Sequence, residues 1–148
     1  SNISDVRRLL TATRVNTAGR SLTALEEDLL DLAHADAELL NGGFPDEAGR
    51  RYSQVLQRLE NNTNDDSCCL EGIHLSLMQA HCHNGLAKVV QMGVAVPDSK
   101  SGEDLAQTSL GLLEDLEIPQ SVRPLHIWHA RSVFTAALSH QRSVARQL

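Results

Sequence analysis

Histidines and cysteines gather in the middle of the chain, and these are the residue types that could do chemistry. The segment carries Cys68, Cys69, His74, His81, Cys82 and His83. Imidazole and thiolate groups are the ligands that zinc prefers. They are also the groups of a thiol enzyme, in which a histidine activates a cysteine. A metal- or thiol-dependent enzyme built on the Cys68–His83 segment is therefore one hypothesis for this chain.

The spacing within this segment does not favour a shared site if the segment is helical. His74 and His81 are two turns apart, which is about 10 Å along a helix axis. His81 and His83 point to nearly opposite sides, because two residues turn a helix by about 200°. A helical zinc pair usually stands at positions i and i+4. We therefore expect no metal, no cofactor and no catalytic residue here. We place His74 and His81 at the border of the core and the other histidine and cysteines of the segment on the surface.

A second group of candidate residues lies near the start of the last expected helix. His126 and His129 flank Trp128, and Arg131 follows them. Tryptophan and arginine are enriched among the residues that dominate binding energy at protein interfaces. These four residues are our candidate interface. The competing interpretation is that Trp128 closes one end of the core.

Other signals of catalysis are weak. Carboxylates cluster at Glu26-Glu27-Asp28, Asp65-Asp66 and Glu114-Asp115. Catalytic carboxylate pairs need buried and contrasting environments, whereas these runs fall at expected caps and polar helix faces. We expect them to be solvated. The pair Gly42-Gly43 ends a helix and lacks the lysine of a phosphate-binding loop.

Composition indicates an all-α domain. The chain has 148 residues, of which 41% are hydrophobic and only 3% are aromatic. That length suits a single domain with a sizeable core. Leucine and alanine supply most of the apolar mass, and both favour helices over strands. No segment alternates apolar and polar residues for long enough to indicate a strand.

Apolar residues at helical spacing predict about six helices. The first runs from Ile3 to about Gly19. The second has a leucine stripe from Leu22 to Leu40, with Thr23 and Glu26 as a capping box. The third begins at Pro45, ends in the polar run Asn61 to Asp66, and buries Tyr52, Val55, Leu56 and Leu59. The fourth starts after a cap at Asp65, Asp66 or Ser67. It either breaks at Asn84-Gly85 or, as we favour, continues to Gly93. The fifth starts near Gly102 and places Leu105, Leu112, Leu113 and Leu116 inward. The sixth follows the turn between Pro119 and Pro124 and places Ile127, Phe134, Ala137, Leu138 and Leu148 inward.

These helices predict a single bundle over residues 1–148. The loop 94–102 contains proline, serine and glycine and is the least structured stretch. It is a candidate boundary between four bundled helices and a terminal helical hairpin. Ser1-Asn2 is typical of what remains after a tag is cleaved, so we expect a domain excised from a larger protein.

Charge and cysteine content restrict the function further. The net charge is −6, which makes general binding to nucleic acid unfavourable. No apolar run reaches the ~20 residues that span a bilayer, so we expect no membrane insertion. The cysteine count is odd and two cysteines are adjacent, which argues against a disulfide framework. We expect an intracellular protein of the cytoplasm or nucleus.

One stretch resembles a known family. The sequence Ile73-His74-Leu75-Ser76-Leu77-Met78-Gln79-Ala80-His81 resembles a segment of steroid receptor RNA activator protein, whose C-terminal domain is similar to the helical end of the vesicle-coat protein Sec31. The order of the preceding helices is also similar, so the resemblance covers residues 5–93. It implies a non-catalytic helical assembly module. The family's tryptophan is absent near Val90, and residues 95–148 have no counterpart.

The sequence therefore favours a non-catalytic protein-interaction, scaffold or adaptor module. Its expected partner is a protein or peptide, for which an amphipathic helix is the natural form because helical bundles present grooves that receive such helices. The alternative to an enzyme or a binding module is homo-oligomerisation, with the leucine stripe of the second helix as the contact.

Overall fold

The computed structural model describes residues 24–40, 43–61, 70–96 and 101–146. Five α-helices occupy these ranges, and the described residues contain no strand. The helices are α2 (Ala24–Leu39), α3 (Pro45–Asn61), α4 (Leu70–Gln91), α5 (Gly102–Glu114) and α6 (Arg123–Arg146). The expected all-α class is confirmed. The expected first helix and Thr23 of the expected capping box lie outside the described residues.

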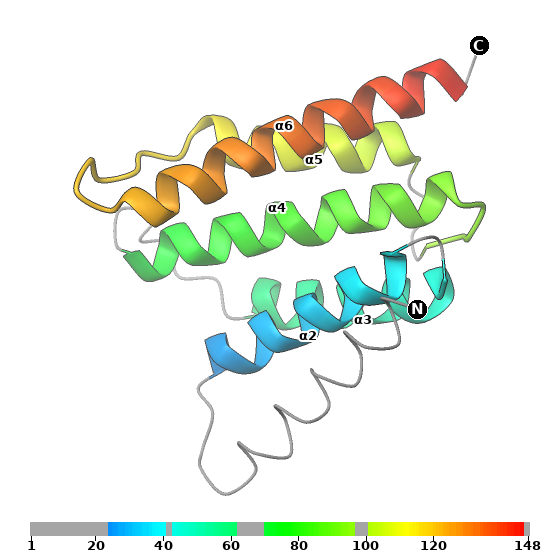
Figure 1. The fold of residues 1–148 in the computed structure, drawn as a ribbon, viewed down its shortest axis with the longest axis horizontal. Coiled ribbons are helices and arrows are strands. Elements are labelled where there is room, and N and C mark those ends of the chain that lie inside the picture. The colour runs from blue at the N-terminus through cyan, green and yellow to red at the C-terminus, as the bar shows by residue number, and fades with distance from the viewer. Residues whose placement is uncertain (1–23, 41–42, 62–69, 97–100, 147–148) are drawn as a thin grey trace, which may run out of the picture.

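Helix α4 lies at the centre and contacts each of the other four helices. Helices α2 and α3 pack on one side of it, and α5 and α6 on the other (Figure 1). Met78 and Cys82 of α4 belong to a buried cluster shared with α2, α3 and the start of α5, whereas Ile73 and Leu77 belong to a second cluster shared with α5 and α6. A helix that is apolar on opposite faces is buried between layers. Such burial makes α4 the shared wall of both clusters.

Helix α4 runs through Gly85 without a break, as predicted. It ends in a Schellman motif, in which a left-handed residue allows two backbone bonds to close the last turn. Gly93 has φ +89°, its N–H donates to the Val90 carbonyl at 2.9 Å, and the Val94 N–H donates to the Val89 carbonyl at 3.3 Å. The chain then turns back toward α5, whose first turn is capped by the Ser101 hydroxyl accepting from the Asp104 N–H.

Helix α3 begins at Pro45 and ends at Asn61, as predicted. Its apolar residues Tyr52, Val55 and Leu59 are buried, which confirms the predicted core face. The α3–α4 contact is close enough that a Cβ on Gly49 would touch the Val89 side chain at 3.2 Å.

Helix α2 follows its leucine stripe only in part. Leu32 is buried and Leu25 and Leu39 pack on the first cluster, but Leu29 and Leu40 are 38% and 47% exposed. Polar residues occupy much of its inner face instead. Asp28 is buried and bound by Arg58 of α3 at 2.8 Å. The prediction that the Glu26-Glu27-Asp28 run is solvated is therefore wrong for Asp28, because an arginine on the neighbouring helix neutralises it.

Helix α6 is turned differently from the prediction. Phe134 and Ile127 are 70% and 49% exposed, and Ala137 is exposed as well. Leu138 is only partly buried, and Leu148 lies outside the described residues. The inward face is instead formed by Leu125, Ala136, Ser139 and Ser143. Pro119 and Pro124 bracket a turn, as predicted, and Pro124 lies in the first turn of α6.

Hydrogen bonds to α4 explain this rotation of α6. The Ser139 hydroxyl donates to the Asn84 side-chain oxygen at 2.7 Å. The Gln91 amide donates to the Ser139 carbonyl at 2.9 Å and to the Ser143 hydroxyl at 2.8 Å. Buried polar groups with partners of this kind are compatible with a core. Small serines also bring the two helices close together, so the larger apolar side chains of α6 face outward.

Candidate functional site

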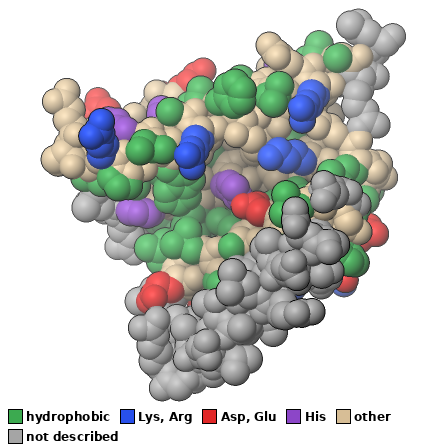
Figure 2. All heavy atoms as spheres, in the orientation of Figure 1, with side chains coloured by type: hydrophobic (Ala, Val, Ile, Leu, Met, Phe, Trp, Pro, Cys, Tyr) green, Lys and Arg blue, Asp and Glu red, His purple; other side chains and the backbone are tan. Residues whose placement is uncertain are grey.

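A groove of about 600 Å³ runs across α4 between α2 and α6. One face of α4 forms its floor through Ala80, His81, Asn84, Lys88 and Gln91, of which Ala80 and Asn84 are buried. Leu39 at the end of α2 and the following Leu40 line one wall, and Trp128, Arg131 and Thr135 of α6 line the other. Figure 2 shows this recess in the centre of the face, with histidine and acidic side chains inside it. We call it the α4 groove.

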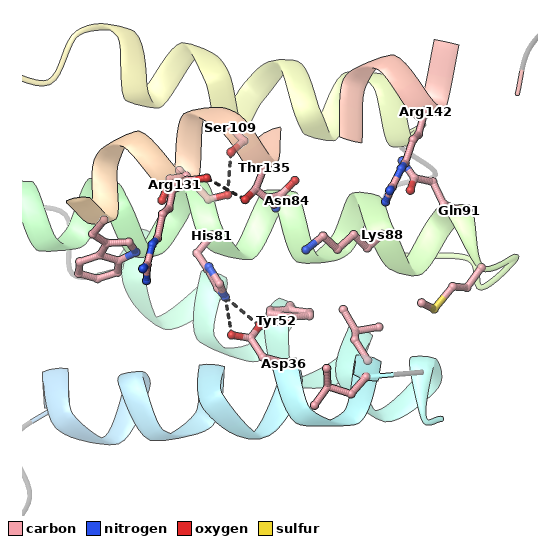
Figure 3. A pocket seen from close by; sticks show the side chains of 16 residues that line it. Asp36, Tyr52, His81, Asn84, Lys88, Gln91, Ser109, Arg131, Thr135 and Arg142 are labelled. Atoms are coloured by element: carbon pink, nitrogen blue, oxygen red, sulfur yellow. Dashed lines mark hydrogen bonds and ion pairs between the residues drawn. The ribbon is translucent and has the colours of Figure 1, made fainter. Parts of the chain in front are cut away.

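A hydrogen-bonded trio fixes one side of the groove. The His81 Nε2 atom lies 2.8 Å and 3.0 Å from the two carboxylate oxygens of Asp36, and the Tyr52 hydroxyl donates to the same carboxylate (Figure 3). The rings of Tyr52 and His81 are 6.0 Å apart and tilted. The trio joins α2, α3 and α4, so it sets the distance between the α2 wall and the floor.

The trio also shifts the pKa values of two of its members. Partial burial alone would raise the pKa of Asp36, but the hydrogen bonds and charge of His81 and the hydrogen bond of Tyr52 lower it below its usual value. Burial raises the pKa of the Tyr52 hydroxyl, and the neighbouring Asp36 charge raises it further. Tyr52 is thus a fixed hydrogen-bond donor, and Asp36 is a carboxylate at neutral pH.

Three basic side chains point into the groove from two helices. Lys88 comes from α4, and Arg131 and Arg142 come from α6 (Figure 3). Among the described residues none forms an ion pair with any of the three. Helix α6 contains four arginines and neither aspartate nor glutamate, although the chain as a whole has a net charge of −6. The groove therefore attracts negative charge on an otherwise acidic molecule.

Two of the four predicted interface residues line the groove and two do not. Trp128 packs partly against both buried clusters and still faces the groove, beside Arg131. Its ring meets that of His74 edge-on at 5.9 Å. His126 and His129 instead hydrogen-bond through Nε2 to the carbonyls of Pro119 and Leu113, at 3.0 Å and 2.9 Å. Those two histidines bind the α5–α6 connection to α6.

The histidines and cysteine of α4 do not converge. Over the residues that the structure places, no three side chains of histidine, cysteine, aspartate or glutamate stand close enough to share a metal ion. His74 meets Trp128, and His81 meets Asp36. Cys82 is a free, buried thiol whose pKa is raised by burial, which makes the reactive thiolate rarer. The prediction that Cys82 and His83 lie on the surface is wrong, because α4 is packed between the other helices and buries both side chains. Cys68 and Cys69 lie outside the described residues, so the enzyme hypothesis that includes them stays a prediction.

Reasoning from sequence missed most residues of the groove. Asp36, Tyr52 and Lys88 come from three different helices, and none belongs to a local motif. Tyr52 gave one signal, because a lone tyrosine in a core needs a partner for its hydroxyl. The identity of that partner depends on helix packing, which the sequence pattern does not contain.

The α4 groove combines apolar walls with a few polar and charged side chains. No described hydroxyl or thiol is hydrogen-bonded to His81, whose Nε2 atom faces Asp36. The Ser109 hydroxyl donates to the Ala80 carbonyl at 2.8 Å and is buried. Apolar walls with a few placed charges are typical of a site that holds a ligand or a peptide.

Searches against protein-family models, curated proteins and solved structures find no match to this chain. The resemblance of residues 5–93 to steroid receptor RNA activator protein therefore stays a prediction. No described helix combines the length and the apolar character that crossing a membrane requires.

Proposed function

We propose that this chain is a non-catalytic protein-interaction module that holds an acidic, amphipathic helical segment of a partner protein in the α4 groove. The observation that carries this proposal is the combination of apolar walls with three cationic side chains in one open groove. Amphipathic helices bind by laying their apolar face into such a groove. A scaffold or adaptor, which is the role that we expect from the sequence, also acts by binding other proteins.

The apolar part of the groove supplies the docking surface. Leu39 and Leu40 on α2 stand across from Trp128 on α6, and Met92 lies at the end of the groove, 44% exposed. Burying such side chains contributes about 25 cal/mol per Å² of apolar area. Trp128 is fixed by its contacts with both clusters, so little side-chain entropy is lost when a partner covers it.

The charges supply the preference for an acidic partner. Lys88, Arg131 and Arg142 surround the groove, and the carboxylate of Asp36 is already satisfied by His81 and Tyr52. A partner helix with glutamates beside its apolar stripe would pair with these cations. Complementary charge of this kind raises association rates and selects between partners.

The test uses two synthetic helical peptides with the same leucine stripe, one flanked by glutamates and one by lysines. Fluorescence anisotropy with the full chain measures their Kd values. We expect the acidic peptide to bind at least about tenfold more tightly, which corresponds to about 1.4 kcal/mol. The preference should weaken as salt is added, because the charges are partly exposed.

Paired variants assign the binding to the groove. Lys88→Glu reverses a charge in the groove, whereas Arg50→Glu makes the same change on the exposed surface of α3. We expect Lys88→Glu to weaken the acidic peptide about tenfold or more and Arg50→Glu to leave its Kd nearly unchanged. Equal binding of both peptides, or equal effects of both variants, would overturn the proposal.

A further inference from the structure

The outer face of α6 carries an apolar stripe that nothing in the described chain covers. Phe134 is 70% exposed, Ile127 49% and Val144 37%, and Ala130 and Ala137 between them are exposed too. These five residues follow one another at steps of three, four, three and seven, which keeps them on one side of a helix. Figure 2 shows hydrophobic side chains along the band that α6 forms at the edge of the molecule.

The three large residues of this stripe, Ile127, Phe134 and Val144, belong to neither buried cluster. The inward face of α6 is Leu125, Ala136, Ser139 and Ser143, and the serines are bonded to α4. Helix α6 therefore has two distinct faces. The face toward α4 carries small or polar side chains, and the opposite face carries apolar side chains that are exposed to solvent. Contiguous exposed apolar side chains mark interaction sites more often than isolated ones do.

The stripe is complementary to itself when its direction is reversed. Phe134 lies near the middle of α6 (Arg123–Arg146). If two copies of α6 pair antiparallel about a point between Thr135 and Ala136, Ile127 stands opposite Val144 of the second copy and Phe134 opposite Ala137. Ala130 then stands opposite Gln141. Each contact occurs twice, as a symmetric interface requires, and the large Phe134 side chain meets a small one.

The charges of α6 are compatible with this pairing. The apolar stripe contains no charged residue, and Arg131 and Arg142 turn from it toward the α4 groove. The stripe itself therefore offers no cation to a partner with acidic side chains. Arg123, at the start of α6, would lie beside the end of the second copy's α6, where unpaired carbonyls carry partial negative charge.

We propose that two copies of this chain form a symmetric dimer through antiparallel pairing of their α6 helices on the stripe of Ile127, Phe134 and Val144. The proposal does not depend on the peptide-binding role of the groove. Helix α6 is about 36 Å long, so a single helix pair buries less than the roughly 800 Å² per partner of a standard interface. We therefore expect a dimer that dissociates in the micromolar range.

Sedimentation equilibrium of the full chain over low to high micromolar concentrations tests the dimer. We expect concentration-dependent dimerisation that Phe134→Glu abolishes. Leu29→Glu is the matched control, because it places the same charge on an exposed apolar residue of α2 that belongs neither to the stripe nor to the α4 groove. It should dimerise like the parent chain, and both variants should keep the parent's melting temperature as a monomer. A monomer at every concentration, or a dimer that survives Phe134→Glu, would overturn the proposal.

Disulfide trapping tests the antiparallel direction separately. Ile127→Cys and Val144→Cys are introduced singly into a chain whose Cys68 and Cys69 are replaced by serine. Antiparallel pairing predicts that neither variant cross-links with itself and that an oxidised mixture of the two yields a covalent dimer. Self-cross-linking of either variant alone would contradict the antiparallel register.

Discussion

Gly85 and Tyr52 touch at the point where α3 crosses α4. A Cβ added to Gly85 would lie 2.4–2.6 Å from three ring carbons of Tyr52, and Tyr52 is almost wholly buried. The ring cannot swing away, because its hydroxyl is bonded to Asp36. The absence of a side chain at this position thus allows both the helix contact and the trio that shapes the α4 groove.

Gly85→Ala should therefore destabilise the protein, although alanine is the better helix former. We expect a loss of roughly 1–3 kcal/mol in the free energy of unfolding, as is usual when atoms are forced into a packed core. Urea unfolding followed by circular dichroism measures it. The same substitution should weaken binding in the groove, since it displaces Tyr52 and with it Asp36.

Gly111→Ala is the matched control for this prediction. Gly111 also lies within a helix, α5, but it is exposed and a Cβ there meets nothing within 4 Å. Replacing glycine by alanine in an exposed helix interior stabilises by about 0.5–1 kcal/mol. If both substitutions raise the free energy of unfolding, the Gly85–Tyr52 contact does not constrain the fold.

At the scale of helices, the contact between α2 and α4 depends strongly on one polar link. Few residues of the two helices are close together, and His81 and Asp36 join them at the groove. Because the folded-state pKa of Asp36 is lowered, the charged carboxylate stabilises the fold above its unfolded pKa of about 4. That contribution is lost as the pH falls through the lower, folded-state value.

Asp36→Asn should therefore change the pH profile of stability. We expect the variant to be less stable than the parent chain at pH 5–7 and the difference to shrink as the pH falls below about 4. Urea unfolding at a series of pH values measures both curves. A difference that stays constant down to the lowest pH would mean that the charge of Asp36 does not contribute to this link.

Helix α6 shows how a helix can present an unexpected face. Its largest apolar residues suggested an inward stripe through Ile127 and Phe134, but serines bonded to Asn84 and Gln91 hold the opposite side against α4. A hydrogen-bonded serine can replace a leucine in a contact because it is small and its hydroxyl is satisfied. The outward apolar stripe is what leads us to the proposed dimer.

At the scale of the whole molecule, Trp128 connects the two buried clusters. It packs partly against the cluster of α2, α3 and α4 and against the cluster of α4, α5 and α6. These contacts support the interpretation that Trp128 closes part of the core. Its position on the wall of the α4 groove supports the other interpretation, an interface. One side chain in this place can serve both.

Trp128→Ala should lower both stability and binding. We expect a loss of roughly 2–3 kcal/mol in the free energy of unfolding, below the 3–5 kcal/mol of a fully buried aromatic residue because Trp128 is only partly buried. Thermal unfolding measures the first effect and peptide anisotropy the second. Lost binding with an unchanged melting temperature would assign Trp128 to the interface alone.

Much of the fold follows from the sequence alone, because helix formation depends on local patterns. The bounds of α3, the continuity of α4 through Gly85 and the start of α5 near Gly102 were predictable from apolar spacing and from Pro45, Gly93 and Ser101. Caps and stop signals act within a few residues of the helix end that they specify. The argument against a site shared by His81, Cys82 and His83 could also be made from the sequence, because it needs only the rotation of successive residues along one helix.

Only the tertiary structure decided how α2 and α6 are turned and which residues share the groove. The rotation of α6 depends on Ser139 meeting Asn84, which lies 55 residues earlier in the chain. The trio likewise brings Asp36, Tyr52 and His81 together from three helices. Such pairings depend on packing between distant segments. In α6 they turn large apolar side chains toward solvent, contrary to the rule that such side chains face inward. A periodic pattern specifies a helix, but its neighbours determine how that helix is turned.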